Sequence, residues 1–295
     1  MRKAALLILS ILLVAACSDD SSDSSVFFVS VARDYGDYSS QNQLETPPQD
    51  QRGLSDELYY LSCRYGTEYT ECLFLEEDGV WSRNGESQDW DTETVISTLW
   101  NLGTGNDDLV IFHYSGHGTE SGALVIDDDA YLELDELLYW MEGIKGKKLL
   151  ILDSCYSGLA IEDSAVLAGG ESYSGGKLSS TSIITSAIAS FGLVFSGKLT
   201  GLDDIWVLAA CTGEQTSWDS WDTGESGQED YGAFTYQVLK ALGYDFGSSS
   251  PSRDGTGSIT LYQLYSKIMD NIPSDLKTIA TPQVKLSLMD LALFY

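Results

Sequence analysis

The chain has 295 residues, and its 45 Asp and Glu against 16 Lys and Arg give a formal net charge of -29 at pH 7. Nucleic acids attract clustered cations, so this charge argues against DNA or RNA as partners. The content of 43% hydrophobic and 11% aromatic residues is too high for an acidic disordered tail, so we expect the chain to fold. Five cysteines are too few for a disulfide-built scaffold. The length fits one large domain or two small ones.

The first residues are typical of an export signal. Arg2 and Lys3 make a basic start, residues 4–14 form an apolar run, and small residues precede Cys17. Such a run is too short to span a bilayer and has the length of a cleaved signal. The ending LVAAC resembles the lipobox of bacterial lipoproteins. This resemblance implies that residues 1–16 are a lipoprotein signal peptide and that acylated Cys17 becomes the mature N-terminus.

The predicted lipidation sets the location and the domain organisation. A multiply acylated Cys17 would attach the protein durably to a membrane of the bacterial cell envelope, at the outer membrane, in the periplasm or at the cell surface. An ordinary secreted protein is the alternative. Residues 17–25, rich in Ser and Asp, predict a flexible tether. Residues 26–295 then form one domain, which we expect to be a monomer.

Hydrophobic patterning predicts a series of alternating strands and helices along that domain. Short apolar runs predict buried strands at residues 26–32, 72–75, 109–112, 148–152 and 205–210. Helical spacing predicts helices at residues 55–65 with Ser55 as the cap, and at 91–102, 131–141, 234–242 and 260–272. Residues 35–53, with Pro47 and Pro48, and the Gly- and Ser-rich residues 159–203 predict loops. This order predicts an α/β fold with a mostly parallel sheet covered on both faces.

Two of these strands end in Gly-rich turns that carry reactive side chains. His117 follows the strand at residues 109–112, and Cys155 follows the strand at 148–152. Ligands gather beyond the carboxyl ends of parallel strands, so neighbouring strands would bring both side chains to one edge. Imidazole is suited to activate a thiol near neutral pH, which predicts a Cys-His dyad. The amides of Gly118 and Cys155 are the expected donors to an oxyanion.

Alternation along the extended chain adds a specificity prediction. Residues two apart point to the same side of an extended chain. The side chain of Asp153 should therefore point to the same side as that of Cys155, and Ser115 to the same side as His117. A carboxylate beside the nucleophile raises the pKa of the thiol and does not help catalysis. It is better explained as the wall of a pocket for a cationic side chain. We therefore expect substrates with Arg or Lys before the cleaved bond.

The same residues carry a family resemblance. Residues 114–118 (YSGHG) and 153–158 (DSCYSG) resemble the two catalytic blocks of metacaspases and other caspase-like cysteine peptidases. The two blocks together are specific, whereas either block alone would be weak evidence for the family. Residues 207–214, 232–235 and 281–283 resemble later segments of that family. The resemblance implies a caspase-like α/β/α sandwich, a His117 and Cys155 dyad, and endopeptidase activity. Caspases carry Gln two residues before the cysteine, whereas metacaspases carry Asp and cut after Arg or Lys. Asp153 matches the basic-specific branch, and Ser115 matches a position lining that pocket.

The chain departs from the metacaspase pattern in places. Tyr156 stands where metacaspases usually have His. A second pocket carboxylate of the family is poorly recognisable here, and Asp56 is our assignment for it. The dyad itself requires no cofactor. Many metacaspases need calcium, but the acidic segment Asp127, Asp128, Asp129, Glu133 and Asp135 lacks EF-hand spacing, so a solvated turn is favoured and the metal site stays unknown.

The remaining cysteines and histidine predict structural roles. His113 lies inside an apolar strand and Cys211 follows two alanines, so both are expected to be structural residues. Cys63 and Cys72 could pair in an oxidising compartment or stay free, and their spacing leaves both outcomes open. No Cys or His pair has zinc-ligand spacing.

Three functional alternatives follow from these residues. The leading hypothesis is a lipid-anchored cysteine endopeptidase that cuts proteins or peptides after basic residues. A catalytically silent surface lipoprotein that uses the fold for binding is the second, and an enzyme of legumain-like or clostripain-like specificity is the third. Two Gly-Lys-Leu segments in the Gly- and Ser-rich region predict self-cleavage after Lys177 or Lys198, with an uncut loop as the alternative.

Overall fold

The computed structural model of the protein describes residues 24–36, 43–127, 130–161, 204–220, 230–244, 246, 259–285 and 290–294. The signal peptide, Cys17, Lys177 and Lys198 lie outside these residues, so the predictions made for them stay predictions. Within the described part of the chain, no helix is both long and apolar enough to cross a membrane.

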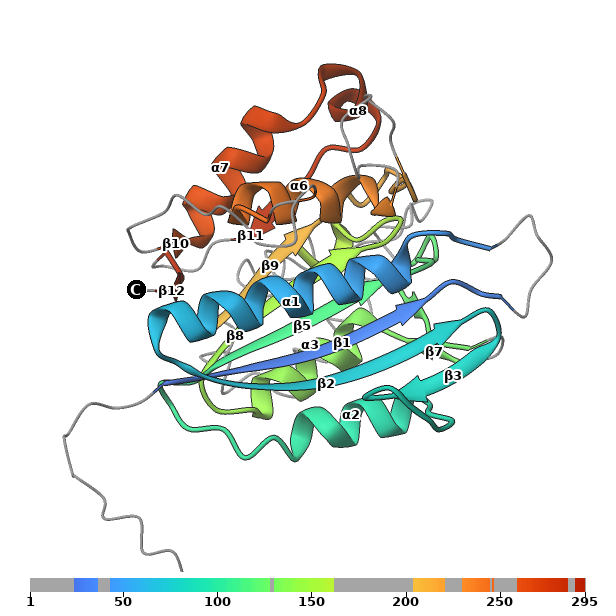
Figure 1. Ribbon diagram of the computed structural model, residues 1–295. Coiled ribbons are helices and arrows are strands. Elements are labelled where there is room, and N and C mark those ends of the chain that lie inside the picture. Colours follow the sequence, from blue (N-terminus) through green and yellow to red (C-terminus); the bar gives the residue numbers. More distant parts are fainter. Residues whose placement is uncertain are drawn as a thin grey trace, which may run out of the picture.

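An eight-stranded sheet forms the centre of the described fold, in the order β11-β9-β8-β5-β1-β2-β3-β4 (Figure 1). Its strands are β1 (Ser25–Arg33), β2 (Glu68–Glu77), β3 (Val80–Arg83), β4 (Glu86–Ser87), β5 (Leu109–Ser115), β8 (Lys147–Asp153), β9 (Ile205–Ala209) and β11 (Gln283–Lys285). The strands from β2 through β1, β5 and β8 to β9 are parallel, and β3, β4 and β11 are antiparallel additions at the two edges. Two short antiparallel pairs join β6 (Leu124–Val125) to β7 (Tyr131–Leu132) and β10 (Ile259–Thr260) to β12 (Ala292–Phe294).

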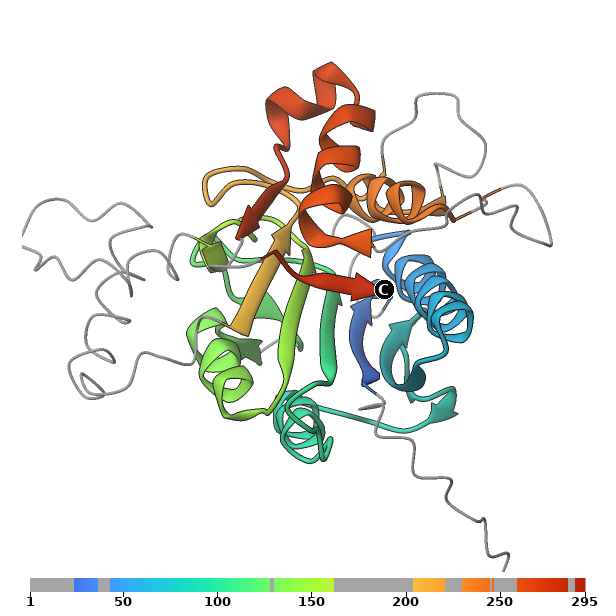
Figure 2. The same ribbon diagram turned by 90° about the vertical axis from the view of Figure 1, so that its left-hand side faces the viewer.

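Helices cover both faces of this sheet. They are α1 (Pro47–Tyr65), α2 (Thr92–Trp100), α3 (Leu134–Gly143), α6 (Ala233–Leu242), α7 (Leu261–Asn271) and α8 (Ser274–Ile279). Figure 2 shows α1 and α6 on one side of the sheet and α2 and α3 on the other. Along β5, Val110 and Phe112 belong to the core under α2 and α3, whereas Leu109 and Ile111 belong to the core under α1, α6 and α7. The predicted α/β fold with a mostly parallel sheet between two helical layers is confirmed.

The prediction of a loop at residues 35–53 is wrong from Pro47 onward. Helix α1 begins at Pro47 and runs through Ser55, so Ser55 does not cap it. Proline is tolerated in the first turn of a helix because that turn needs no amide donors, and its fixed φ suits the helix. The Pro47-Pro48 pair therefore marks a helix start, and Ser55 lies inside the helix with its hydroxyl bonded to Glu71.

The predicted helix at residues 131–141 is wrong in its first turn. Tyr131 and Leu132 form β7, and α3 begins at Leu134. Tyr131 is exposed and Leu132 is buried, which is the alternation of a strand and not of a helix. The other predicted strands and helices are confirmed, with their ends shifted by a few residues.

Candidate active site

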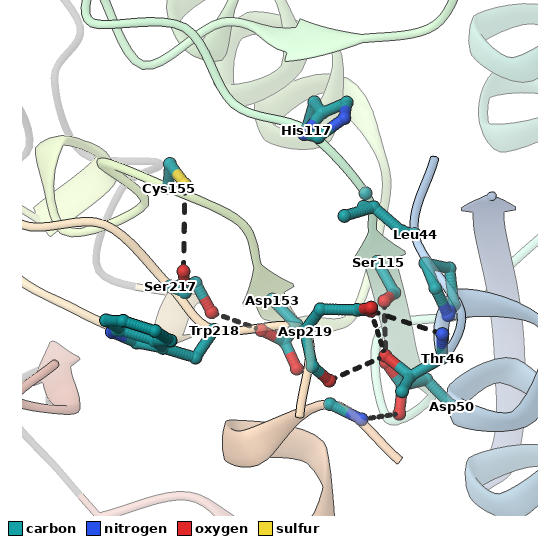
Figure 3. A pocket seen from close by; sticks show the side chains of 13 residues that line it. Leu44, Thr46, Asp50, Ser115, His117, Asp153, Cys155, Ser217, Trp218 and Asp219 are labelled. Atoms are coloured by element: carbon teal, nitrogen blue, oxygen red, sulfur yellow. Dashed lines mark hydrogen bonds between the residues drawn. The ribbon is translucent and has the colours of Figure 1, made fainter. Parts of the chain in front are cut away.

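Strands β5 and β8 are adjacent and parallel, and this pairing assembles the site. Their register places Ser115 opposite Asp153, at the carboxyl end of both strands. His117 and Cys155 each follow two residues later and line the same open pocket of about 310 Å³. Figure 3 shows the imidazole and the thiol near one end of this pocket, with Asp50 and Asp153 toward the other. The structure thus brings the four predicted site residues together.

The thiol of Cys155 lies partly exposed in the turn after β8. Its Sγ is 3.9 Å from the carbonyl oxygen of Ser217, to which it donates. Burial raises the pKa of the Cys155 thiol above its ordinary value, and the charge of Asp153 adds to this shift. The next residue, Tyr156, has a left-handed backbone with φ of 59°, and its amide donates to the carbonyl of Gln215. The free thiol is therefore held mainly protonated near neutral pH and needs a base to react.

Gly118 lies against the main chain of Cys155. A Cβ atom at this position would lie 2.2 Å from the Cys155 carbonyl oxygen, so no larger residue fits without a shift. Gly118 pairs with Leu124 in an isolated antiparallel bridge whose hydrogen bonds come from the neighbouring residues. In a non-hydrogen-bonded antiparallel pair of this kind, the amides of the two facing residues point away from each other. The Gly118 amide therefore points away from Leu124.

The carboxylate of Asp153 is buried and is hydrogen-bonded through both oxygens. One oxygen accepts from the Ser217 hydroxyl at 2.7 Å, and the other accepts from the Thr235 amide at 3.1 Å and its hydroxyl at 2.8 Å. Burial raises the pKa of Asp153, and the three hydrogen bonds oppose that rise because they favour the charged form. This network fixes the direction in which the carboxylate presents its charge.

The second carboxylate of the pocket is Asp50, and our assignment of Asp56 is wrong. Asp50 is fully buried in the first turn of α1, where its oxygens accept from the Ser115 hydroxyl at 2.7 Å and the Gly232 amide at 2.8 Å. Asp56 lies on the same helix but is exposed. The error follows from the missed helix start, because a helix that begins at Pro47 has Asp50 in its first turn.

Asp50 and Asp153 approach one another around Gly232. A Cβ atom on Gly232 would lie 2.6 Å from an oxygen of Asp153 and 2.8 Å from an oxygen of Asp50. Burial, and then the charge of Asp153, raise the pKa of Asp50 well above its ordinary value. A third carboxylate, Asp219, also lines the pocket and accepts from the Thr46 amide at 3.1 Å.

The pocket has the chemistry of a cation site. The described residues that line it include no Lys or Arg: they are Leu44, Thr46, Pro47, Asp50, Ser115, Gly116, His117, Asp153, Cys155, Ser217, Trp218, Asp219 and Gly232. Buried like charges destabilise one another, and a bound cation relieves both the repulsion and the cost of burial. The arrangement suits a cationic side chain at the bottom of the pocket, beside Asp50 and Asp153. The thiol of Cys155 and the imidazole of His117 lie at its mouth.

The other cysteines and histidine have structural positions. His113 is fully buried, its Nδ1 lies 2.8 Å from the Ser30 hydroxyl, and burial lowers its pKa to about 3. Its Nε2 has no hydrogen-bond partner among the described atoms. Cys211 is buried, and burial raises its pKa to about 11. Cys63 and Cys72 are both free thiols, so the disulfide alternative is not realised.

The acidic segment considered for calcium is only partly described. Asp127 Oδ1 lies 3.9 Å from Nη2 of Arg33, Glu133 precedes α3 and Asp135 lies in its first turn, while residues 128–129 lie outside the described residues. Among the residues that the structure describes, no group of three or more His, Cys, Asp or Glu side chains is arranged to hold a metal ion.

Comparisons with known proteins place the chain in a family. The model of the family described as the caspase domain matches residues 33–288. Among solved structures, caspase-1 from Spodoptera frugiperda matches with a TM-score of 0.51 and 14% identity, covering 91% of this chain and 90% of the other. A protein from Geobacter sulfurreducens matches with a TM-score of 0.49 and 16% identity, covering 89% and 93%. No curated protein matches by sequence.

Proposed function

The chain belongs to the caspase domain family, and from this premise we propose that it is a cysteine endopeptidase that cleaves proteins or peptides after Arg or Lys. The observation that carries the proposal is the shared pocket. It holds a thiol and an imidazole together with buried carboxylates, and the described residues lining it supply no cation of their own.

The first chemical step is attack by Cys155. Because burial raises the pKa of its thiol, the nucleophile forms only when the imidazole of His117 accepts the thiol proton. The thiolate sulfur then bonds to the carbonyl carbon of the scissile peptide, and the carbonyl electrons move onto its oxygen. The amides of Gly118 and Cys155 are the proposed donors to this oxyanion. The glycine suits this role because a side chain there would collide with the Cys155 carbonyl.

The remaining steps complete the turnover. The imidazolium of His117 gives its proton to the leaving amine as the C–N bond breaks, which leaves a thioester on Cys155. His117 then takes a proton from water, and the resulting hydroxide attacks the thioester carbon. The C–S bond breaks, the acid product leaves, and the sulfur regains its proton. No cofactor is needed for this sequence. A calcium requirement is a separate proposal, tested by activity with and without the ion.

The basic specificity comes from the base of the pocket. Asp50 and Asp153 offer two carboxylates that flank Gly232, and Ser115 supports Asp50 through its hydroxyl. A guanidinium or ammonium group entering between them forms charge-assisted hydrogen bonds in a site that excludes most water. A substrate with an Asp or a neutral side chain at this position would leave the two carboxylates without a counterion, so it binds more weakly.

The test is a panel of fluorogenic peptides with Arg, Lys, Asn or Asp before the reporter group, with and without calcium. We expect turnover of the Arg and Lys peptides that disappears in Cys155→Ala and in His117→Ala. Turnover of the Asn peptide alone would favour the legumain-like specificity. Absence of Cys155-dependent turnover under every condition would contradict the proposed peptidase activity and favour the catalytically silent lipoprotein that uses the fold for binding.

We also propose attachment of the protein to the cell envelope through acylated Cys17. The export signal at residues 1–16 supports this proposal. In a bacterial host that processes lipoproteins, the full chain should partition with membranes and incorporate a labelled fatty acid, and Cys17→Ser should lose both properties. Membrane attachment that persists in Cys17→Ser would contradict it. A single species of monomer mass in light scattering of the Cys17→Ser protein tests the expected oligomeric state.

A further inference from the structure

Tyr35 is a buried aromatic residue in the turn that follows β1. It is 1% exposed, and its backbone is left-handed with φ of 61°. A residue with a Cβ atom keeps such a conformation only where its surroundings fix it. Here the Tyr35 amide donates to Oε2 of the fully buried Glu76 at 2.8 Å. The guanidinium carbon of the buried Arg33 lies 4.6 Å from the Tyr35 ring centroid. The Tyr35 side chain is therefore held rigidly.

This side chain contacts His117 in two ways. The amide of His117 donates to the Tyr35 hydroxyl oxygen at 2.7 Å. The two rings also pack against each other, with centroids 4.4 Å apart and an interplanar angle of 34°. One rigid side chain thus fixes the main chain of His117 and restricts the rotation of its imidazole.

A second hydroxyl completes the support. The Tyr35 and Tyr114 hydroxyl oxygens are 3.0 Å apart, and the Tyr114 hydroxyl donates to the His117 carbonyl at 2.8 Å. Both hydroxyls also lie 3.0 Å from the Val125 carbonyl. A Cβ atom on Gly116 would lie 2.7 Å from the Tyr114 oxygen and 2.9 Å from the Tyr35 oxygen. The turn that carries His117 is therefore built around this hydroxyl pair, which holds both the amide and the carbonyl of His117.

We propose that Tyr35 is a positioning residue for the imidazole of His117. The inference rests on the proposed function, because it matters for turnover only if His117 acts as the base. Proton transfer between the Cys155 thiol and the imidazole requires hydrogen-bond distance and alignment. Displacements of about 1 Å cost roughly 100-fold in rate. A turn held only by its own backbone leaves the ring free to rotate, and Tyr35 prevents this.

The kinetic test compares two substitutions of Tyr35 with a matched control. Tyr35→Phe keeps the ring and loses the hydroxyl, so we expect kcat for an Arg peptide to fall about 10-fold with KM unchanged. Tyr35→Leu loses both contacts, and we expect a fall of about 100-fold. The control is Tyr69→Phe on β2, whose hydroxyl bonds to Glu71 at 3.0 Å and does not touch the pocket. A fall in Tyr69→Phe equal to that in Tyr35→Phe would overturn the proposal.

A second readout needs no turnover. In wild-type protein, the His117 amide should exchange its hydrogen slowly in NMR, and Tyr35→Phe should accelerate this exchange about 10-fold or more. Rapid exchange of that amide in wild-type protein overturns the positioning role even if the variants do not fold. Full kcat in folded Tyr35→Phe overturns only the positioning role, whereas absence of turnover in wild-type protein overturns the proposed function.

Discussion

Replacing Asp50 by Asn removes one negative charge from the base of the pocket and keeps the shape of the side chain. Asp50 accepts from the Gly232 amide at 2.8 Å and from the Ser115 hydroxyl at 2.7 Å. The Asn oxygen would keep the first bond, and its amide group would donate to the Ser115 oxygen once that hydroxyl rotates. We therefore expect the fold to persist and only the charge to be lost.

The expected effect on catalysis follows from the burial of that charge. Truncating one partner of a buried, hydrogen-bonded charge pair costs about 2–5 kcal/mol. Because Asp153 stays, we expect the lower part of this range, about 2–3 kcal/mol. At about 1.4 kcal/mol per factor of ten, this is a fall of roughly 30- to 150-fold in kcat/KM for Arg peptides.

The same change should stabilise the folded protein at neutral pH. Burial and the charge of Asp153 raise the pKa of Asp50 in the folded state, so folding there opposes ionisation. The unfolding free energy of the wild type therefore falls as pH rises above the ordinary carboxyl pKa, and Asp50→Asn lacks this fall. Thermal melts should show a higher Tm for the variant at pH 7 and little difference below pH of about 4.

Peptidase assays and melts of Asp50→Asn beside Asp56→Asn make the test selective. Asp56 is exposed on the same helix, so the control makes the same charge change away from the pocket. A kcat/KM within twofold of the wild type in Asp50→Asn would refute the assignment of the pocket. The assignment would also be refuted if Asp50→Asn lowered kcat/KM equally for Arg peptides and for peptides with a neutral residue before the cleaved bond.

The remaining predictions concern the oxyanion, the buried histidine and processing. Gly118→Ala would place a Cβ atom 2.2 Å from the Cys155 carbonyl oxygen, so kcat should fall roughly 100-fold with little change in KM in the same peptide assay; an unchanged kcat contradicts the oxyanion role. The pKa of His113 is lowered from 6.5 to about 3, so the unfolded chain binds a proton that the folded chain does not as pH falls through that window. The unfolding free energy should therefore decrease as the pH is lowered from 6.5 to about 3. Urea titrations of His113→Gln should show a smaller decrease over this pH range; an equal decrease in both proteins contradicts this. Active protein should be cut after Lys177 or Lys198, and mass spectrometry of the intact protein should show one chain when both lysines are replaced by alanine. A wild-type chain that stays uncut while it turns over peptide contradicts self-processing.

The sequence predicts the reactive edge of the sheet because its signals are local. The apolar runs before His117 and Cys155 have the composition of buried parallel strands, and Gly-rich turns follow both. Alternation alone places Ser115 and Asp153 on the pocket side. The two hairpins at the sheet edge also carry a local signal. Asp78-Gly79 joins β2 to β3 and Asn84-Gly85 joins β3 to β4, all with positive φ, as type I′ two-residue hairpin turns require.

Other parts of the site depend on contacts between distant segments. The hydrogen bond from the His117 amide to Tyr35 spans 82 residues of sequence, and the bond from Gly232 to Asp50 spans 182. No periodicity or spacing reports such a contact, because it arises only when the sheet forms. For Asp50 the local signal is the start of α1 at Pro47, because a helix start placed at Ser55 leaves Asp50 in a loop and favours Asp56 as the carboxylate.

Labelling with a peptidyl-arginine chloromethyl ketone tests the central claim most directly. In this reaction, the Cys155 sulfur displaces chloride and the inhibitor stays bound, so peptide mass spectrometry locates the reacting residue. The exposed thiol of Cys63 serves as an internal control for nonspecific alkylation. The proposed function predicts one adduct, on Cys155, lost in His117→Ala and not formed with the corresponding aspartyl reagent. An adduct on Cys63 with Cys155 unmodified, or equal labelling by both reagents, would contradict it.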